Sequence, residues 1–347
     1  MTDSPTPDLL ARRESFYNEL EPHAMAALWT RLRKLIPAEP TPAGVAHRWA
    51  YETARPYLME SATLISAEEA ERRVLLMENP GLPGTSRITN TMYAGLQLIL
   101  PGEVAPAHRH TQSAFRFIVE GSRAFTAVDG EKSYMEPGDL VITPAWTWHH
   151  HGHEGDAPMV WLDGLDIPIV SFFNGGFREE FDAEEAPITR PAGDALARYG
   201  TGLMPVGYTA STLNSPVFNY PYARTREALF ALTRAGDPDA NAGHLMRYTN
   251  PVDGGWAMPT LATMIRLLPT GFSTTPYRST DSTVFVCVEG GGHITVGDKR
   301  LELAPHDIVV VPGWSRYTLH ANNDLVLFSY SDRVAQEKLG LFREQRS

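Results

Sequence analysis

The sequence predicts a mainly β protein in which two similar β domains follow a helical segment. From about Arg72 onward, short apolar runs such as GLQLILPGE, AFRFIVEG and DLVITP alternate with turns rich in Gly, Pro and Asp. Many short strands at this spacing are typical of a sandwich or barrel. An internal repeat is the second observation: MEPGDLVITPAWTWH, ending at His149, is matched by LAPHDIVVVPGWSRY, ending at Tyr317, and each follows a VEG turn. Chance similarity is the alternative, but the shared order of several turns favours a duplicated domain.

The chain divides into four segments. Residues 1–70 are expected to be helical, because apolar residues recur at helical spacing between Leu9 and Leu32 before Pro37 breaks the pattern. Residues 71–185 form the first β domain, and residues 258–347 form the second. Residues 186–257 connect the two domains as a loop that becomes helical around 225–234.

Composition and charge exclude several classes of function. The chain has 347 residues, enough for two domains, and a net charge of -11 without any block of Lys or Arg, so we expect no nucleic-acid partner. No apolar run approaches the length of a membrane span and the N-terminus lacks an apolar signal core, which predicts no membrane association. The single cysteine, Cys287, permits no intramolecular disulfide and favours a cytoplasmic location, with the thiol buried and inert.

Three histidines of the first β domain form a candidate metal site. His108 and His110 are two residues apart, so on a strand both imidazoles point to the same face. His149 follows a Gly-Asp turn, and a neighbouring strand would bring it to the same place. Three neutral imidazoles suit a divalent first-row metal and leave coordination positions open. A chance cluster is the alternative, since further histidines follow His149 directly.

The spacing around these histidines resembles the two cupin motifs. The motifs in this chain are Gly102-x5-His108-x-His110 followed by Gly121, and Gly138-x5-Pro144-x4-His149. The resemblance implies a bicupin, with two jelly-roll β-barrel domains after the N-terminal helical segment and a metal in the mouth of one barrel. Ala114 stands where the usual cupin has a glutamate ligand, so the predicted site has three histidines and no carboxylate.

A three-histidine site of this kind is similar to that of the gentisate 1,2-dioxygenase family, which has salicylate and 1-hydroxy-2-naphthoate dioxygenases as relatives. The resemblance extends from about residue 72 to residue 332 and includes WLDGLD, NYPY, MPT and PYRSTDST. It implies one Fe(II) per chain, a small aromatic hydroxy acid and O2 as substrates, and a homotetramer. The implied reaction cleaves the C1–C2 ring bond of gentisate and gives maleylpyruvate. The alternatives are cleavage of salicylate or 1-hydroxy-2-naphthoate and, in a different class, a non-catalytic bicupin for ligand binding or storage.

Arg116 is the predicted anchor of the substrate carboxylate and is assigned a catalytic role. It shares strand parity with the histidine pair, which aims it into the barrel. Its planar fork matches a carboxylate, and an acidic chain needs a local cation for an anionic substrate. The alternative is a structural salt bridge to an interior acid such as Asp163. If Arg116 is not the anchor, Arg72 or Arg73 is the next candidate.

Three residues on the preceding strand share the face that is expected to contact the substrate. Gln97 is predicted to hydrogen-bond a ring hydroxyl or the carboxylate. Gly95 is predicted to leave room for the flat ring, and Tyr93 to wall it. Ordinary core packing is the alternative for Tyr93.

His151 has the same strand parity as His149 and is therefore also expected to face inward. We expect it to hydrogen-bond substrate or bound oxygen and to exchange a proton, which makes it a catalytic candidate. Asp163 is expected to contribute to substrate binding by orienting His151 or Arg116. His150 should point away from the site.

The second β domain is predicted to hold no metal. Aligning the two VEG turns places Tyr277 and Ser279 where His108 and His110 stand, and aligning the Pro-Trp turns places Tyr317 where His149 stands. We expect this domain to be structural or a partner surface. Binding of a small organic molecule by the degenerate barrel is the alternative.

Overall fold

The computed structural model describes residues 6–346, which fall into two compact units with their boundary between Thr41 and Pro42. The first unit contains α1 (Pro7–Leu20), the 3-10 turn η1 (Glu21–His23) and α2 (Leu28–Leu35). The Thr6 hydroxyl caps α1 by accepting a hydrogen bond from the Leu9 amide. Neither helix has a buried residue. The predicted N-terminal helical segment is therefore present.

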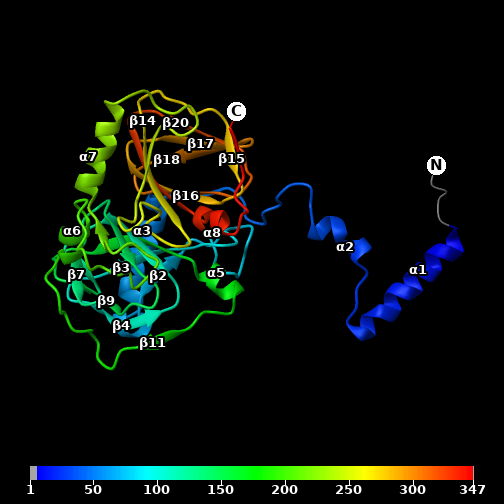
Figure 1. Ribbon diagram of the computed structural model, residues 1–347, viewed down its shortest axis with the longest axis horizontal. Helices are drawn as coiled ribbons and strands as arrows, with labels where there is room; N and C mark the ends of the chain where they lie inside the picture. Colours follow the sequence, from blue (N-terminus) through cyan, green and yellow to red (C-terminus); the bar gives the residue numbers. More distant parts are fainter. Residues whose placement is uncertain (1–5, 347) are drawn as a thin grey trace. The chain divides into compact units, whose positions relative to one another are not determined.

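The second unit contains two β-barrels, each built from two antiparallel sheets (Figure 1). In the first barrel, one sheet has the strand order β12 (Asn219–Tyr220), β8 (Leu140–Thr143), β5 (Ala114–Glu120), β10 (Met159–Leu165), β3 (Tyr93–Ile99) and β2 (Arg73–Leu76). The other has the order β11 (Arg178–Glu180), β4 (Val104–His110), β9 (His149–His153), β6 (Ala124–Val128) and β7 (Glu131–Tyr134). The strands that carry the predicted site residues are central in these sheets.

The second barrel repeats this arrangement. Its larger sheet has the order β1 (His47–Trp49), β19 (Ile308–Val311), β16 (Thr283–Glu289), β21 (Leu325–Ser331), β14 (Ala262–Leu268) and β13 (His244–Arg247). Its smaller sheet has the order β18 (Lys299–Leu303), β17 (Gly292–Val296), β20 (Tyr317–Ala321), β15 (Tyr277–Ser279) and β22 (Glu344–Arg346). The remaining helices are α3 (Tyr51–Leu64), α4 (Ala67–Ala70), α5 (Ile167–Phe172), α6 (Asp194–Tyr199), α7 (Tyr222–Thr233) and α8 (Arg333–Lys338).

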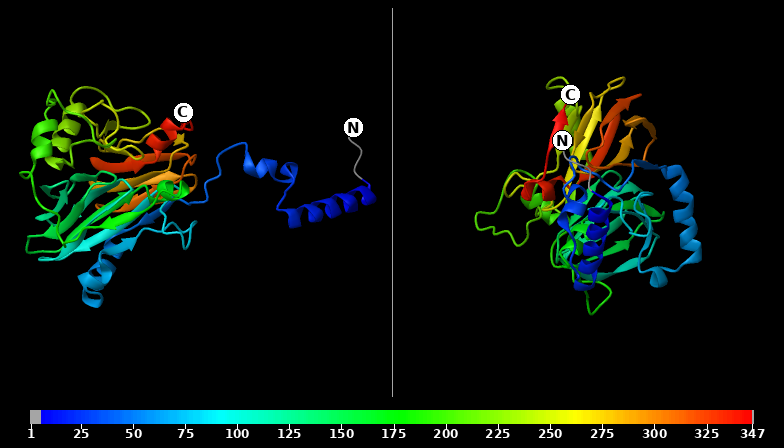
Figure 2. Two further views of the ribbon diagram at one scale, coloured as in Figure 1. Left: turned by 60° about the horizontal axis from the view of Figure 1, so that its bottom comes forward. Right: turned by 90° about the vertical axis from the view of Figure 1, so that its right-hand side faces the viewer.

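The two barrels pack against each other through their larger sheets, which lie as successive layers in the left view of Figure 2. The rings of Phe117 and Phe328 stack with centroids 4.1 Å apart, and Phe115 meets Tyr330 edge-on at 4.8 Å. Each such buried aromatic side chain contributes roughly 1.5–3 kcal/mol. Because strand residues alternate in direction, this packing turns the even-numbered residues of β5, including Arg116, into the first barrel.

The Pro-x-Trp turns show that the internal repeat is structural. Trp146 and Trp314 both have left-handed backbone conformations, with φ of 60° and 62°. The Trp146 amide donates to the carbonyl of His110, and the Trp314 amide donates to the carbonyl of Ser279. The same strained turn therefore connects equivalent strands in both barrels, and the predicted bicupin fold is confirmed.

Short edge strands differ from the sequence-based expectation. β1 lies within the segment expected to be helical, yet it pairs with β19 of the second barrel. β12 and β13, from the connecting segment, pair with β8 and β14. Strands of two to four residues are too short for the alternation that reveals a strand in sequence. Within residues 6–346, no helix is both long and apolar enough to span a membrane.

Candidate metal and substrate site

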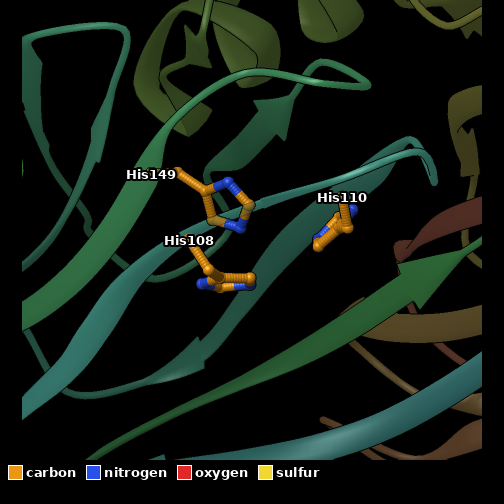
Figure 3. A group of neighbouring side chains, drawn as sticks. All are labelled: His108, His110 and His149. Carbon is orange, nitrogen blue, oxygen red and sulfur yellow. The ribbon is translucent and has the colours of Figure 1, made fainter. Parts of the chain in front are cut away.

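His108, His110 and His149 converge at one end of the first barrel. β4 and β9 are paired neighbours, and His108 lies directly opposite His149 in their register. One ring nitrogen of each histidine lies within 4.8 Å of those of the other two. Figure 3 shows the three imidazoles facing a common point between the strands. The predicted cluster is thus assembled by strand pairing.

Hydrogen bonds to the backbone orient all three imidazoles. The Nδ1 atoms of His108, His110 and His149 lie 3.1, 2.9 and 2.8 Å from the carbonyl oxygens of Pro106, Gln112 and Thr147. With Nδ1 protonated, each ring keeps Nε2 free as a metal ligand. The Nε2 of His149 is buried and has no hydrogen-bond partner among the described residues. A buried polar atom of this kind is costly, and a bound metal would satisfy it.

Burial keeps these imidazoles neutral, as metal ligands must be. Burial and the charge of Arg72 lower the pKa of His108 to about 2, and burial lowers the pKa of His110 to about 4. Burial also lowers the pKa of His149 well below its ordinary value. The donor set is three neutral nitrogens, with no carboxylate in the cluster among the described residues. This set fits a divalent first-row metal with open positions for other ligands.

Arg116 projects into the barrel with only part of its guanidinium engaged. Its side chain is nearly fully buried, Nη1 donates to the Thr143 hydroxyl at 2.6 Å, and Nε lies 3.5 Å from Asp163 Oδ1. Within residues 6–346, Nε has no hydrogen-bond partner of good geometry. Burial lowers the pKa of Arg116 to about 10, so the group stays cationic at neutral pH. The structure therefore contains the alternative ion pair to Asp163, and it also leaves donors of Arg116 available.

Arg72 and Arg73 have different environments. Arg72 Nη2 lies 2.9 Å from His108 Nδ1 and 3.3 Å from the Pro106 carbonyl oxygen. Arg72 carries only donors, so the 2.9 Å contact fits the tautomer in which His108 Nδ1 accepts. Metal binding through Nε2 requires the other tautomer, in which Nδ1 donates to Pro106 and Arg72 turns from Nδ1 toward the same carbonyl. Arg73 instead donates to Glu103 at 2.6 Å and to the Ile65 carbonyl, as a buried structural pair. Arg72 is thus the second cation beside the histidines, whereas the sequence alone did not distinguish it from Arg73.

His151 lies behind the histidine cluster inside the barrel. Its ring centroid is 5.8 Å from that of His149, and its Nδ1 is 3.0 Å from the Thr126 hydroxyl. Its Nε2 is buried without a partner among the described residues. Burial, and then the charge of Arg116, hold the pKa of His151 well below its ordinary value. His150, by contrast, packs against Phe125 on the outside of the barrel wall.

The three residues expected on β3 lie on the predicted inward face. Gln97 is buried opposite Trp161, and it lines a small cavity together with Arg72. A Cβ atom on Gly95 would lie 2.4 Å from Val74 Cγ1 and 2.9 Å from the Tyr93 hydroxyl. The space beside Gly95 is therefore filled by these side chains, whereas strand parity alone predicted room for the substrate ring there. The lining role of Val74 was not predicted.

The ionisation of Asp163 gives the folded protein a specific pH dependence. Burial raises the pKa of Asp163 from 3.8 to about 6, although the charge of Arg116 opposes the shift. A carboxyl whose pKa is higher in the folded than in the unfolded protein stabilises the fold at a pH below its pKa in the unfolded chain. This contribution to the free energy of unfolding is lost as the pH rises through the pKa of the folded protein. Asp163→Asn cannot ionise, so its free energy of unfolding relative to wild type should rise by up to about 3 kcal/mol between pH 4 and 7.5. Urea unfolding at a series of pH values measures this difference. A constant difference would show that Asp163 titrates normally.

The second barrel carries other side chains at the equivalent positions. Tyr277 lies opposite Tyr317 in the register of β15 and β20, as His108 lies opposite His149. Since no histidine occupies these positions, we predict one iron per chain in the fully loaded protein. Metal analysis against protein concentration measures the ratio. Two irons per chain, with the second lost on substitution of Tyr277, would contradict this prediction.

A jelly-roll barrel with three inward histidines at its mouth, packed on a second barrel, defines a bicupin with one candidate metal site. Comparison with known proteins agrees with this assignment, because the cupin domain family model matches residues 95–165. The chain is 52% identical to gentisate 1,2-dioxygenase 1 of Aquipseudomonas alcaligenes over the full length of both proteins. It is 39% identical to a gentisate 1,2-dioxygenase of a Streptomyces species, over 96% of this chain and 95% of the relative.

A solved structure shares the whole architecture. Salicylate 1,2-dioxygenase of Pseudaminobacter salicylatoxidans, in its adduct with gentisate, superimposes with a TM-score of 0.91 at 34% identity. The alignment covers 99% of this chain and 95% of that one. The chain belongs to the gentisate 1,2-dioxygenase family.

Proposed function

We propose that this chain is an iron(II)-dependent gentisate 1,2-dioxygenase that cleaves the C1–C2 ring bond of gentisate and yields maleylpyruvate, with both atoms of O2 incorporated. The observation that carries the proposal is a three-histidine site without a carboxylate, beside a buried arginine, in a chain 52% identical to a gentisate 1,2-dioxygenase. His108, His110 and His149 would hold one iron per chain. Iron, when bound, supplies the redox chemistry that lets dioxygen react with the aromatic ring.

The protein side chains supply binding, orientation and proton transfer. Arg116 holds the substrate carboxylate through the donors that Asp163 and Thr143 leave free. Arg72 adds a second positive charge at the mouth of the barrel, which offsets the acidity of the chain. His151, oriented by Thr126, presents Nε2 toward the barrel interior, where it exchanges a proton with a ring hydroxyl. Gln97 and Tyr93 lie on the adjoining wall and contact the substrate there.

Oxygen uptake by the iron-loaded enzyme tests the proposed substrate. The panel consists of gentisate, salicylate and 1-hydroxy-2-naphthoate at equal concentrations, with product identified by mass. We expect the highest kcat/KM with gentisate and one O2 consumed per ring cleaved. Faster turnover of salicylate or 1-hydroxy-2-naphthoate would assign the chain to that substrate. Binding of gentisate without oxygen uptake would instead favour a ligand-binding or storage protein.

We also propose that the protein is a cytoplasmic homo-oligomer, with a tetramer as the favoured state. Its only cysteine is fully buried, and burial raises the pKa of the Cys287 thiol to about 12, so the thiol stays protonated and unreactive.

In the first unit, α1 and α2 have no buried residue, and Trp29 and Leu35 are 67% and 65% exposed. Exposed apolar helix surfaces of this kind are typical of contacts between chains.

Substitutions in α2 test the oligomer. Trp29→Ser with Leu32→Ser removes apolar contact area, so the assembly should shift to smaller species. Light scattering coupled to gel filtration measures the mass, and Arg31→Ser on the same helix is the matched control. A wild-type protein that is a fully active monomer would overturn the proposal.

A further inference from the structure

The second barrel contains a small polar cavity at the position equivalent to the metal site of the first barrel. Its volume is about 60 Å³, and its walls include Tyr277, Ser279 and Tyr317. These residues occupy the strand positions of the three histidines, as the paired register of Tyr277 and Tyr317 shows. The barrel has therefore kept a hollow mouth although its side chains have changed.

Arg266 enters this cavity from β14 without an acidic partner. The residue is 4% exposed, and its Nε is buried without a hydrogen bond within residues 6–346. No carboxylate oxygen of the described chain lies within 4.0 Å of its guanidinium, which instead rests over the ring of Phe285 at 5.2 Å and near Tyr317. A buried cation without a counter-charge is strongly unfavourable in a protein interior. The arrangement calls for an anion that the protein itself does not provide.

The other cations of the cavity wall are already paired. Arg333 contacts Glu337 at 2.7 Å, and Arg346 contacts Glu344 at 3.2 Å. Arg266 is thus the unpaired cation among the wall residues that the structure describes. Its fork offers two parallel donors, which suit a carboxylate better than a spherical ion.

Asp281 is the second unsatisfied group of the cavity. It is 6% exposed, and its Oδ1 is buried without a hydrogen-bond partner in the described part of the chain. Burial raises the pKa of Asp281, which favours the protonated carboxyl as a donor to an acceptor oxygen. A carboxylate ligand would satisfy both groups, whereas the carboxylate of Glu344 in the cavity wall disfavours a dianion such as phosphate.

We propose that the second barrel binds a small monocarboxylate anion, with its carboxylate on the guanidinium of Arg266. The size of the ligand follows from the cavity. One water needs roughly 10–15 Å³ of such space, so 60 Å³ holds about four to six heavy atoms, the size of acetate or glycolate. An aromatic acid such as gentisate is too large for it. This site is separate from the catalytic barrel and does not depend on the proposed substrate.

Binding of carbon-13-labelled acetate to the iron-loaded enzyme, followed by NMR line broadening at constant ionic strength, tests the proposal. Acetate also has access to the arginines of the first barrel, so the titration is made in an Arg116→Met background. We expect saturable binding in that background, weakened about tenfold or more by adding Arg266→Met, because the buried charge partner is lost. Arg266→Lys should bind with intermediate affinity, since it keeps the charge and loses the fork.

A cavity-filling variant guards against misfolding of the Arg266 variants. Ala242 lines the cavity, so Ala242→Val reduces its volume while Arg266 stays in place, and acetate binding should weaken. Iron content and circular dichroism report whether each variant is folded. Equal acetate affinity with and without Arg266 in folded protein would overturn the proposal. So would loss of all saturable binding in Arg116→Met alone, because the anion would then bind in the first barrel only.

Discussion

Replacing His149 by alanine is expected to remove iron from the protein and to lower kcat with gentisate by about a thousandfold or more, since several kcal/mol of metal-dependent stabilisation are lost. His149 supplies one of three nitrogens that lie within 4.8 Å of one another, and its Nε2 is buried with no other partner in residues 6–346. Two histidines alone leave the ion with weaker and less selective binding. Iron content by metal analysis and oxygen uptake on the same samples measure both effects.

The neighbouring histidine provides a matched control. His150 is equally buried on the same strand, but it faces Phe125 on the other side of the barrel wall. His150→Gln should therefore keep its iron and most of its activity, while any loss of stability from disturbing β9 is shared with His149→Ala. Full iron content in His149→Ala would remove that residue from the site.

The features of this molecule that the sequence predicts correctly rest on the two-residue periodicity of strands and on the internal repeat. The two-residue period of a strand is enough to place His108 with His110, His149 with His151, and Arg116 on the inner face. The stacking of Phe117 on Phe328 explains why this placement holds for Arg116. That contact fixes one face of β5 against the second barrel, so the other face points into the first barrel. The repeated Pro-x-Trp turn likewise allows the second barrel to be aligned with the first.

The features that sequence could not predict depend on contacts distant in the chain. β1 is three residues long and pairs with a strand more than 250 positions later, so no local pattern marks it. Arg72 contacts His108, which lies 36 positions later in the chain. The next residue, Arg73, is also an arginine, so the sequence does not show which of the two lies at the site. Only the pairing of Arg73 with Glu103 separates the two. Likewise, the space beside Gly95 depends on Val74, which the register of β2 and β3 brings there.

Arg116→Met is expected to weaken transition-state binding of gentisate by about 2–5 kcal/mol, the range for losing one partner of a buried charge pair, which lowers kcat/KM by about 30- to 5000-fold. The structure gives Arg116 two protein contacts, one from Nη1 to Thr143 and one from Nε to Asp163 at 3.5 Å. These contacts fix the plane of the guanidinium and leave its remaining edge for a substrate carboxylate. Arg116→Lys keeps the charge without the fork and should be intermediate. Iron content should stay normal in both variants.

The decisive measurement compares gentisate with hydroquinone ligands that lack the carboxylate. If Arg116 is the anchor, the preference of wild type for gentisate should largely disappear in Arg116→Met, because only the carboxylate interaction is lost. Arg73→Met is the matched control: it removes a buried arginine of the same barrel whose partner is Glu103, so stability should fall while the preference remains. Arg72→Met tests the rival cation beside His108. If wild type prefers gentisate by no more than Arg116→Met does, and Arg72→Met loses the preference instead, then Arg72 is the anchor and Arg116 forms a structural ion pair with Asp163.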